Sequence, residues 1–87
     1  MHLVKMRLVG VAPDRTLVDS AVVSDLIWAH ALAQDGVEHV VTRVEPDSMT
    51  VVLFIRTAHE THARVIAAEL MKRAAAAPAM RGWQISP

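Results

Sequence analysis

The chain of 87 residues contains no cysteine, only three glycines and four prolines, and only 3% aromatic residues. The absence of cysteine excludes disulfides, thiolate metal sites and thiol catalysis. Nine basic and nine acidic residues leave no formal net charge. Because proteins that bind duplex nucleic acid normally carry an excess of basic residues, we expect no partner of that kind.

Long apolar runs are also missing. No stretch reaches the roughly 18 apolar residues that a membrane-spanning helix needs. The first residues, Met1 to Lys5, lack the layout of a secretory signal peptide. We therefore expect a soluble cytoplasmic protein without a membrane partner, which agrees with the lack of cysteine.

Apolar residues nevertheless make up 53% of the chain, so the core must consist of aliphatic side chains, alanine and methionine. The length predicts a single domain over residues 1–87. A chain this short buries a modest core, and association with a second copy is a common way to add stability. We expect a homodimer, although a high alanine content explains the apolar excess equally well.

The spacing of the apolar residues divides the chain into six segments. Apolar and basic residues alternate from Val4 to Leu8, which predicts a half-buried strand. The predicted strands are residues 4–11, 37–44, 49–55 and 83–85, and the predicted helices are residues 17–33 and 60–77. This order indicates an α+β fold, the ferredoxin-like two-layer sandwich (βαββαβ). In that fold two helices cover one face of a four-stranded antiparallel sheet.

Each helix has an expected cap and an expected buried stripe. Thr57 and Glu60 match the T-x-x-E capping box, while the first helix has Thr16 with Asp19, or Asp14 as the alternative cap. The expected stripe of the first helix is Val18, Val22, Leu26, Ala29 and Ala33, and that of the second is Ala63, Ile66, Ala67, Leu70 and Ala74.

The sheet face without helices is the best candidate site. If the apolar residues of the first and third strands face the helices, basic residues gather on the opposite face around an apolar centre. Guanidinium groups there suit a carboxylate or phosphate, so we expect an anionic small molecule or an acidic protein segment as ligand. The candidate ligand-binding residues are Lys5, Arg7, Arg43, Phe54 and Arg56. The alternative is an ordinary solvated face with its charges paired to Glu38 or Glu45.

Two further features are candidates for contacts. Tryptophan is enriched at interfaces, and Trp28 lies on the flank of the first helix, so we expect Trp28 and Val52 at a protein interface. His59 and His62 lie at i and i+3, a spacing that can hold a metal. Two ligands are too few for a site, so we expect no metal and no cofactor.

No motif points to a catalytic centre. The sequence has no G-x-S-x-G elbow, no Gly-rich phosphate loop and no stacked aromatics like those of RNA-recognition motifs. The sequence therefore favours a non-catalytic binding module, dimeric, that uses the open sheet face. The alternative is a small cofactor-free enzyme, of an oxygenase or cyclase type, acting on an apolar or aromatic metabolite. Its cavity would hold His30, His39 or His59 as acid-base group and Trp28 as a wall.

Overall fold

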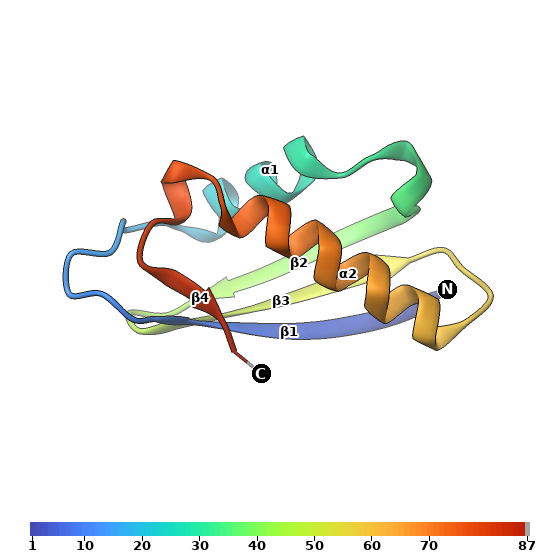
Figure 1. Ribbon diagram of the computed structural model, residues 1–87, viewed down its shortest axis with the longest axis horizontal. Coiled ribbons are helices and arrows are strands. Elements are labelled where there is room, and N and C mark those ends of the chain that lie inside the picture. The colour runs from blue at the N-terminus through green and yellow to red at the C-terminus, as the bar shows by residue number, and fades with distance from the viewer. Residues whose placement is uncertain (87) are drawn as a thin grey trace.

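The computed structural model describes residues 1–86, so Pro87 at the end of the predicted domain lies outside the described residues. It forms two layers, with both helices on one face of a sheet whose other face is open (Figure 1). The strands are β1 (His2–Gly10), β2 (Val37–Val44), β3 (Ser48–Ile55) and β4 (Trp83–Ile85), and the helices are α1 (Ser20–His30) and α2 (Glu60–Ala75). The predicted α+β, ferredoxin-like sandwich is confirmed.

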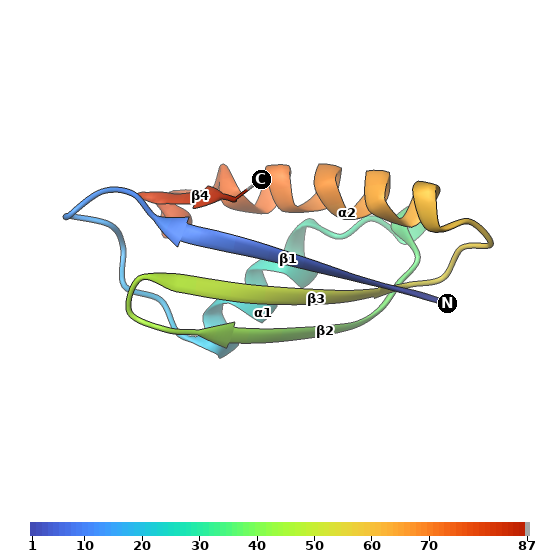
Figure 2. The ribbon, with the colours of Figure 1, turned by 90° about the horizontal axis from the view of Figure 1, so that it is seen from below.

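The sheet is antiparallel and has the order β2-β3-β1-β4. The most apolar strand, β3, therefore lies inside the sheet and pairs with β2 and β1 (Figure 2). Strand β1 pairs with β3 from His2 to Val9, whereas β4 pairs only with Leu8 to Gly10. The short fourth strand thus covers only one end of β1.

The core lies between the sheet and the helices. Met49, Val51, Leu53 and Ile55 alternate along β3 and are buried under α2 and α1, as the sequence predicts. Their neighbours on the opposite face are only half buried. The buried side chains of α2 are Ala63, Ala67, Leu70, Met71 and Ala74, with Ile66 packed beside them, so the predicted stripe of this helix is confirmed.

The predicted stripe of the first helix is only partly right: Val18 and Leu26 pack against the core, but the other three residues do not. The helix is shorter than expected, and its buried residues are Val23 and Ile27, while Val22, Ala29 and Ala33 are exposed. Hydroxyl contacts accompany this rotation: Ser24 Oγ lies 2.9 Å from Thr42 Oγ1, which also donates to the Ser20 carbonyl. Thr42 is on the helix-facing side of β2, so its hydroxyl needs a partner from α1.

The helix caps also differ from expectation. Asp19 alone caps α1, because its side chain accepts a hydrogen bond from the Val22 amide. In α2 the predicted capping box is wrong: His59 occupies the N-cap position without a side-chain bond, and Thr57 Oγ1 lies 3.2 Å from His62 Nδ1. Glu60 is paired with Arg64 one turn along the helix.

Gly36 has the positive φ (67°) that favours glycine, but it follows a short 3₁₀ turn (Ala33–Asp35) rather than α1 itself. A Cβ at this position would lie 2.9 Å from the Arg56 carbonyl oxygen. The close approach lets the Arg56 amide donate to the Gly36 carbonyl at 2.8 Å. This contact ties the connection before β2 to the end of β3.

Candidate functional site: the open sheet face

Two arginines flank a threonine across three strands of the open face. Thr50 on β3 is the register partner of Arg7 on β1 and of Arg43 on β2. Since neighbouring strands lie about 4.8 Å apart, the backbones of the two arginines are separated by about 10 Å. Both side chains are exposed and project from the same face, so they can reach one carboxylate or phosphate between them.

Lys5 extends this row into a basic cluster, which we define as Lys5, Arg7 and Arg43. Lys5 lies two residues from Arg7 along β1 and opposite Val52. No carboxylate of residues 1–86 forms an ion pair with Lys5 or Arg7. Arg43 is paired with Glu45 at 3.6 Å, but both side chains are largely exposed, so this contact is weak.

The other end of the open face is apolar. Phe54 pairs with Leu3 on one side and with His39 on the other, where the two rings lie 5.5 Å apart. Leu3 is 58% exposed. Val52 and Val41 form the next pair toward the basic cluster. The open face therefore joins an apolar end to a basic end along about 13 Å of β3, four residues from Phe54 to Thr50.

Arg56 does not lie with the basic cluster. It follows the end of β3, six residues or about 20 Å along the strand direction from Thr50. Its Nε lies 3.2 Å from a carboxylate oxygen of Glu38, at the irregular register between Val37 and His39. The sequence placed Arg56 on this face from strand alternation alone. For Arg56 and Arg43 the structure agrees with the alternative interpretation, in which the charges are paired to Glu38 and Glu45.

Trp28 lies beside a separate hollow at the β2 edge. The hollow has a volume of about 260 Å³, and Trp28, Leu32, Val37, Glu38 and Arg56 are among its lining residues. Trp28 is 44% exposed and Leu32 is 47% exposed. Val52, the other predicted interface residue, is half buried on the open face, so the structure does not bring Trp28 and Val52 together.

The two candidate metal ligands lie at the start of α2. His59 is at the N-cap position and His62 contacts the Thr57 hydroxyl. Within residues 1–86, no group of three or more histidine or carboxylate side chains is close enough to hold a metal. The other histidines that the sequence offered are elsewhere: His39 is on the open face, and His30 Nδ1 lies 2.9 Å from the Leu26 carbonyl.

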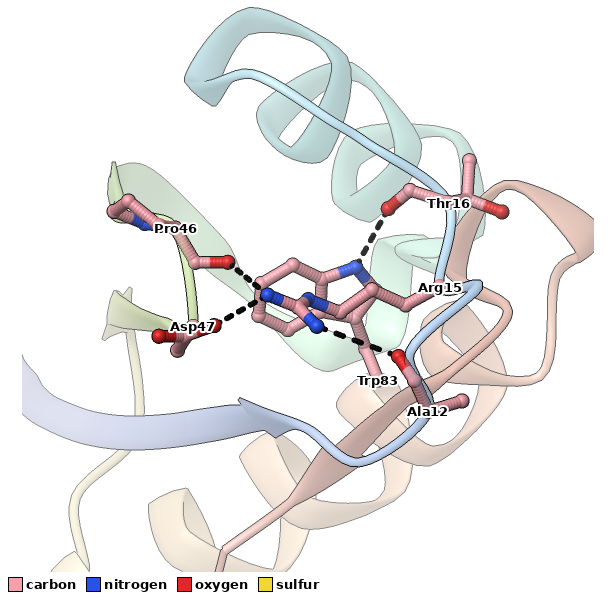
Figure 3. Close-up of polar contacts among 6 residues, drawn as sticks. All are labelled: Ala12, Arg15, Thr16, Pro46, Asp47 and Trp83. Atoms are coloured by element: carbon pink, nitrogen blue, oxygen red, sulfur yellow. Dashed lines mark hydrogen bonds and ion pairs between the residues drawn. The ribbon is translucent and has the colours of Figure 1, made fainter.

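Sequence reasoning missed a polar cluster at the end of the sheet (Figure 3). Arg15 pairs with Asp47, donates to the Pro46 carbonyl at 2.7 Å and lies over the Trp83 ring, 5.6 Å from its centroid. The Trp83 indole N–H donates to the Thr16 carbonyl at 2.8 Å. The two terminal nitrogens of Arg15 bond to groups of the neighbouring loops, whereas its Nε is buried without a partner. The cluster therefore fastens loops together rather than presenting a site.

Comparisons of the chain with protein-family models, with curated proteins and with solved structures found no match. Neither described helix has the length and apolar character that a membrane crossing requires.

Proposed function

We propose that the protein is a non-catalytic, cytoplasmic binding module whose open sheet face holds an acidic segment of a partner protein. The observation that carries the proposal is the Arg7–Thr50–Arg43 row, with Lys5 beside it. Lys5 and Arg7 have no ion-pair partner within residues 1–86. Carboxylates of a partner pair with these two bases through charge-assisted hydrogen bonds.

The apolar end of the face favours a protein segment over a small anion. Leu3 and Phe54 are register partners on neighbouring strands, and Leu3 is largely exposed. A partner that carries carboxylates at one end and apolar side chains at the other matches both halves of the face. Apolar contact adds affinity, while the charges set the orientation and the rate of association.

The enzyme hypothesis finds less support. A cofactor-free enzyme needs a largely enclosed apolar cavity with a positioned acid-base group. The space between the sheet and the helices is filled by fully buried side chains, including Leu53, Leu70 and Met71. The hollow beside Trp28 is open at the surface, as are two hollows along β1, one lined by Lys5 and Arg64 and the other by Lys5 and Arg7. None of the three has a histidine in its lining.

Replacement of Arg7 and Arg43 by alanine tests the proposal. The probe is polyglutamate, with binding measured by isothermal titration calorimetry at several salt concentrations. Each exposed ion pair contributes up to about 1 kcal/mol, so we expect each single variant to bind about three- to fivefold more weakly. The double variant should also show a smaller dependence of affinity on salt, because fewer charges are screened.

Lys72→Ala is the matched control, because Lys72 is an exposed base on α2, away from the open face. It removes one positive charge but should leave the affinity and its salt dependence close to those of the wild type. Equal losses in the control and the arginine variants would show attraction by overall charge, and the assignment of the open face would fail.

We propose further that the protein forms a homodimer through the exposed surface at Trp28 and Leu32. An exposed tryptophan that contributes to an interface commonly accounts for 2 kcal/mol or more of binding. We expect native mass spectrometry to show a fraction of dimer that rises with protein concentration. Trp28→Ala should weaken the affinity of dimerisation about thirtyfold. Val65→Ala, at an exposed apolar position on α2, is the control. A monomer at every concentration would exclude this interface.

A further inference from the structure

One long edge of the sheet is left without a neighbour. Strand β1 pairs with β3 over its length, but on its other side β4 pairs only with Leu8 to Gly10. Beyond β4 the Ser86 amide donates to the Arg7 carbonyl at 2.8 Å. In the part of the chain that the structure describes, residues 2–6 therefore have no strand on the side away from β3; we call this segment the free edge (Figure 2).

The backbone of the free edge presents hydrogen-bonding groups outward. The Gly10 amide donates toward β3, to the Asp47 carbonyl, whereas the Arg7 carbonyl accepts from the β4 side. Backbone groups alternate between the two sides of a strand, and the β1–β3 register runs without interruption. The N–H and C=O groups of Leu3 and Lys5 must then point away from β3. They form a template on which another strand can pair.

The surface beside this template is hollowed. One hollow of about 250 Å³ is lined by Leu3, Val4, Lys5 and Arg64, and a second of about 360 Å³ is lined by Lys5, Met6, Arg7 and Ser86. They share Lys5, so together they follow β1 from its start to the point where β4 ends. Helix α2 runs beside this edge and supplies Arg64 (Figure 2).

The side chains along the free edge differ between the two faces. Lys5 and Arg7 project to the open face, while Val4 and Met6 project toward the helices and are partly buried. Arg64 adds a third base, although it is paired at 3.3 Å with Glu60 in an exposed contact. A strand laid here would place alternate side chains beside bases and beside apolar groups.

These charges decide which occupant fits. Two copies of β1 paired edge to edge would bring Lys5 and Arg7 of both chains into one short ladder. Like charges opposite one another in a sheet are destabilising, so the bases oppose self-pairing. An extended segment in which acidic and apolar residues alternate meets both kinds of neighbour.

We propose that an acidic, extended segment of a partner protein adds to the sheet as a strand beside residues 2–6 of β1. The inference rests on the proposed function, because Lys5 and Arg7 belong to the basic cluster of the open face. It adds that backbone hydrogen bonds from Leu3 and Lys5 hold the segment at the free edge, where Lys5 and Arg7 hold its carboxylates. Strand addition uses backbone pairing for affinity and side-chain alternation for specificity.

The test uses a short synthetic peptide in which glutamate and valine alternate, and the same peptide with every backbone amide methylated. Methylation keeps the charges and removes all backbone donors. We expect the methylated peptide to bind the wild-type protein about tenfold more weakly, since a lost hydrogen bond leaves a buried acceptor unpaired. Binding is measured by fluorescence anisotropy.

Leu3→Pro tests the same point from the protein side. It removes an N–H that faces the free edge and breaks no bond to β3, a position where proline is tolerated. Leu3→Ala is the matched control, because it removes the side chain and keeps the N–H. We expect Leu3→Pro to bind the unmodified peptide about tenfold more weakly than Leu3→Ala. Circular dichroism of both variants verifies the fold.

The outcomes separate this inference from the proposed function. If both peptides bind equally and Arg7→Ala weakens both, strand addition is overturned and binding on the open face stands. If polyglutamate binds and the alternating peptide does not, strand addition alone is again overturned. If polyglutamate fails to bind, both proposals fall. A dimer that dissociates in Leu3→Pro but not in Leu3→Ala would assign the free edge to a second copy and overturn the inference.

Discussion

Trp83→Ala is expected to lower the free energy of unfolding by about 3–5 kcal/mol, the range for removing a large aromatic side chain from a core. Trp83 is 7% exposed and is the buried side chain of β4, the shortest strand. Its ring also supports the Arg15 guanidinium, which pairs with Asp47 in the turn between β2 and β3. The substitution therefore removes core packing and loosens two loops at once.

Trp83→Phe separates these contributions. It keeps an aromatic ring in the core and removes the N–H that donates to the Thr16 carbonyl. We expect this variant to lower the free energy of unfolding by about 1–3 kcal/mol. Denaturant unfolding of the two variants measures the difference. A loss below about 1 kcal/mol in Trp83→Ala would mean that β4 does not pack on the core as described.

Leu53→Ala is expected to cost about 2–5 kcal/mol, because Leu53 is fully buried at the centre of an inner strand. Val4 on β1 and Val40 on β2 are its register partners, so the cavity is enclosed by three strands below the helices. Neighbouring side chains can collapse only partly into such a cavity, which places the cost well above that of a surface change.

Val52→Ala is the control for Leu53, since it lies one position away on the open face and is half buried. We expect it to cost less than Leu53→Ala by at least about 1 kcal/mol. The same unfolding experiment measures both. If Val52→Ala were the more damaging substitution, the open face would be covered and the helices would lie over the wrong residues.

The sequence predicts the sheet well because alternation along a strand reports directly which face is buried. The alternation of apolar and basic residues from Val4 to Leu8 correctly separated the core face of β1 from its open face. In β3 the burial alternates although every residue from Val51 to Ile55 is apolar. The helical spacing of apolar residues did not identify the buried face of α1. Nearly every residue from Ala21 to Ala29 is apolar, so several stripes fit equally well. The contact between Ser24 and Thr42 accompanies the rotation of α1, and the inward-facing hydroxyl on β2 was the available signal.

The candidate site was predictable only in part. Strand alternation placed Lys5 and Arg7 on the open face, but Arg43 joined them only once the register of β2 was known. Arg56 and the Arg15 cluster depend on contacts between residues far apart in the chain, such as Arg15 with Pro46 and Trp83 with Thr16. Spacing within one element carries no information on such contacts. The free edge depends likewise on how far β4 extends along β1.

The measurement that tests the central claim most directly is an NMR titration of the ¹⁵N-labelled wild-type protein with polyglutamate. Binding on the open face predicts that the largest amide shifts fall on Lys5, Arg7, Arg43 and Thr50, and that they fade as salt is added. Shifts centred on Lys72 and Arg81, or spread evenly over the molecule, would contradict the assignment of the open face as the binding surface.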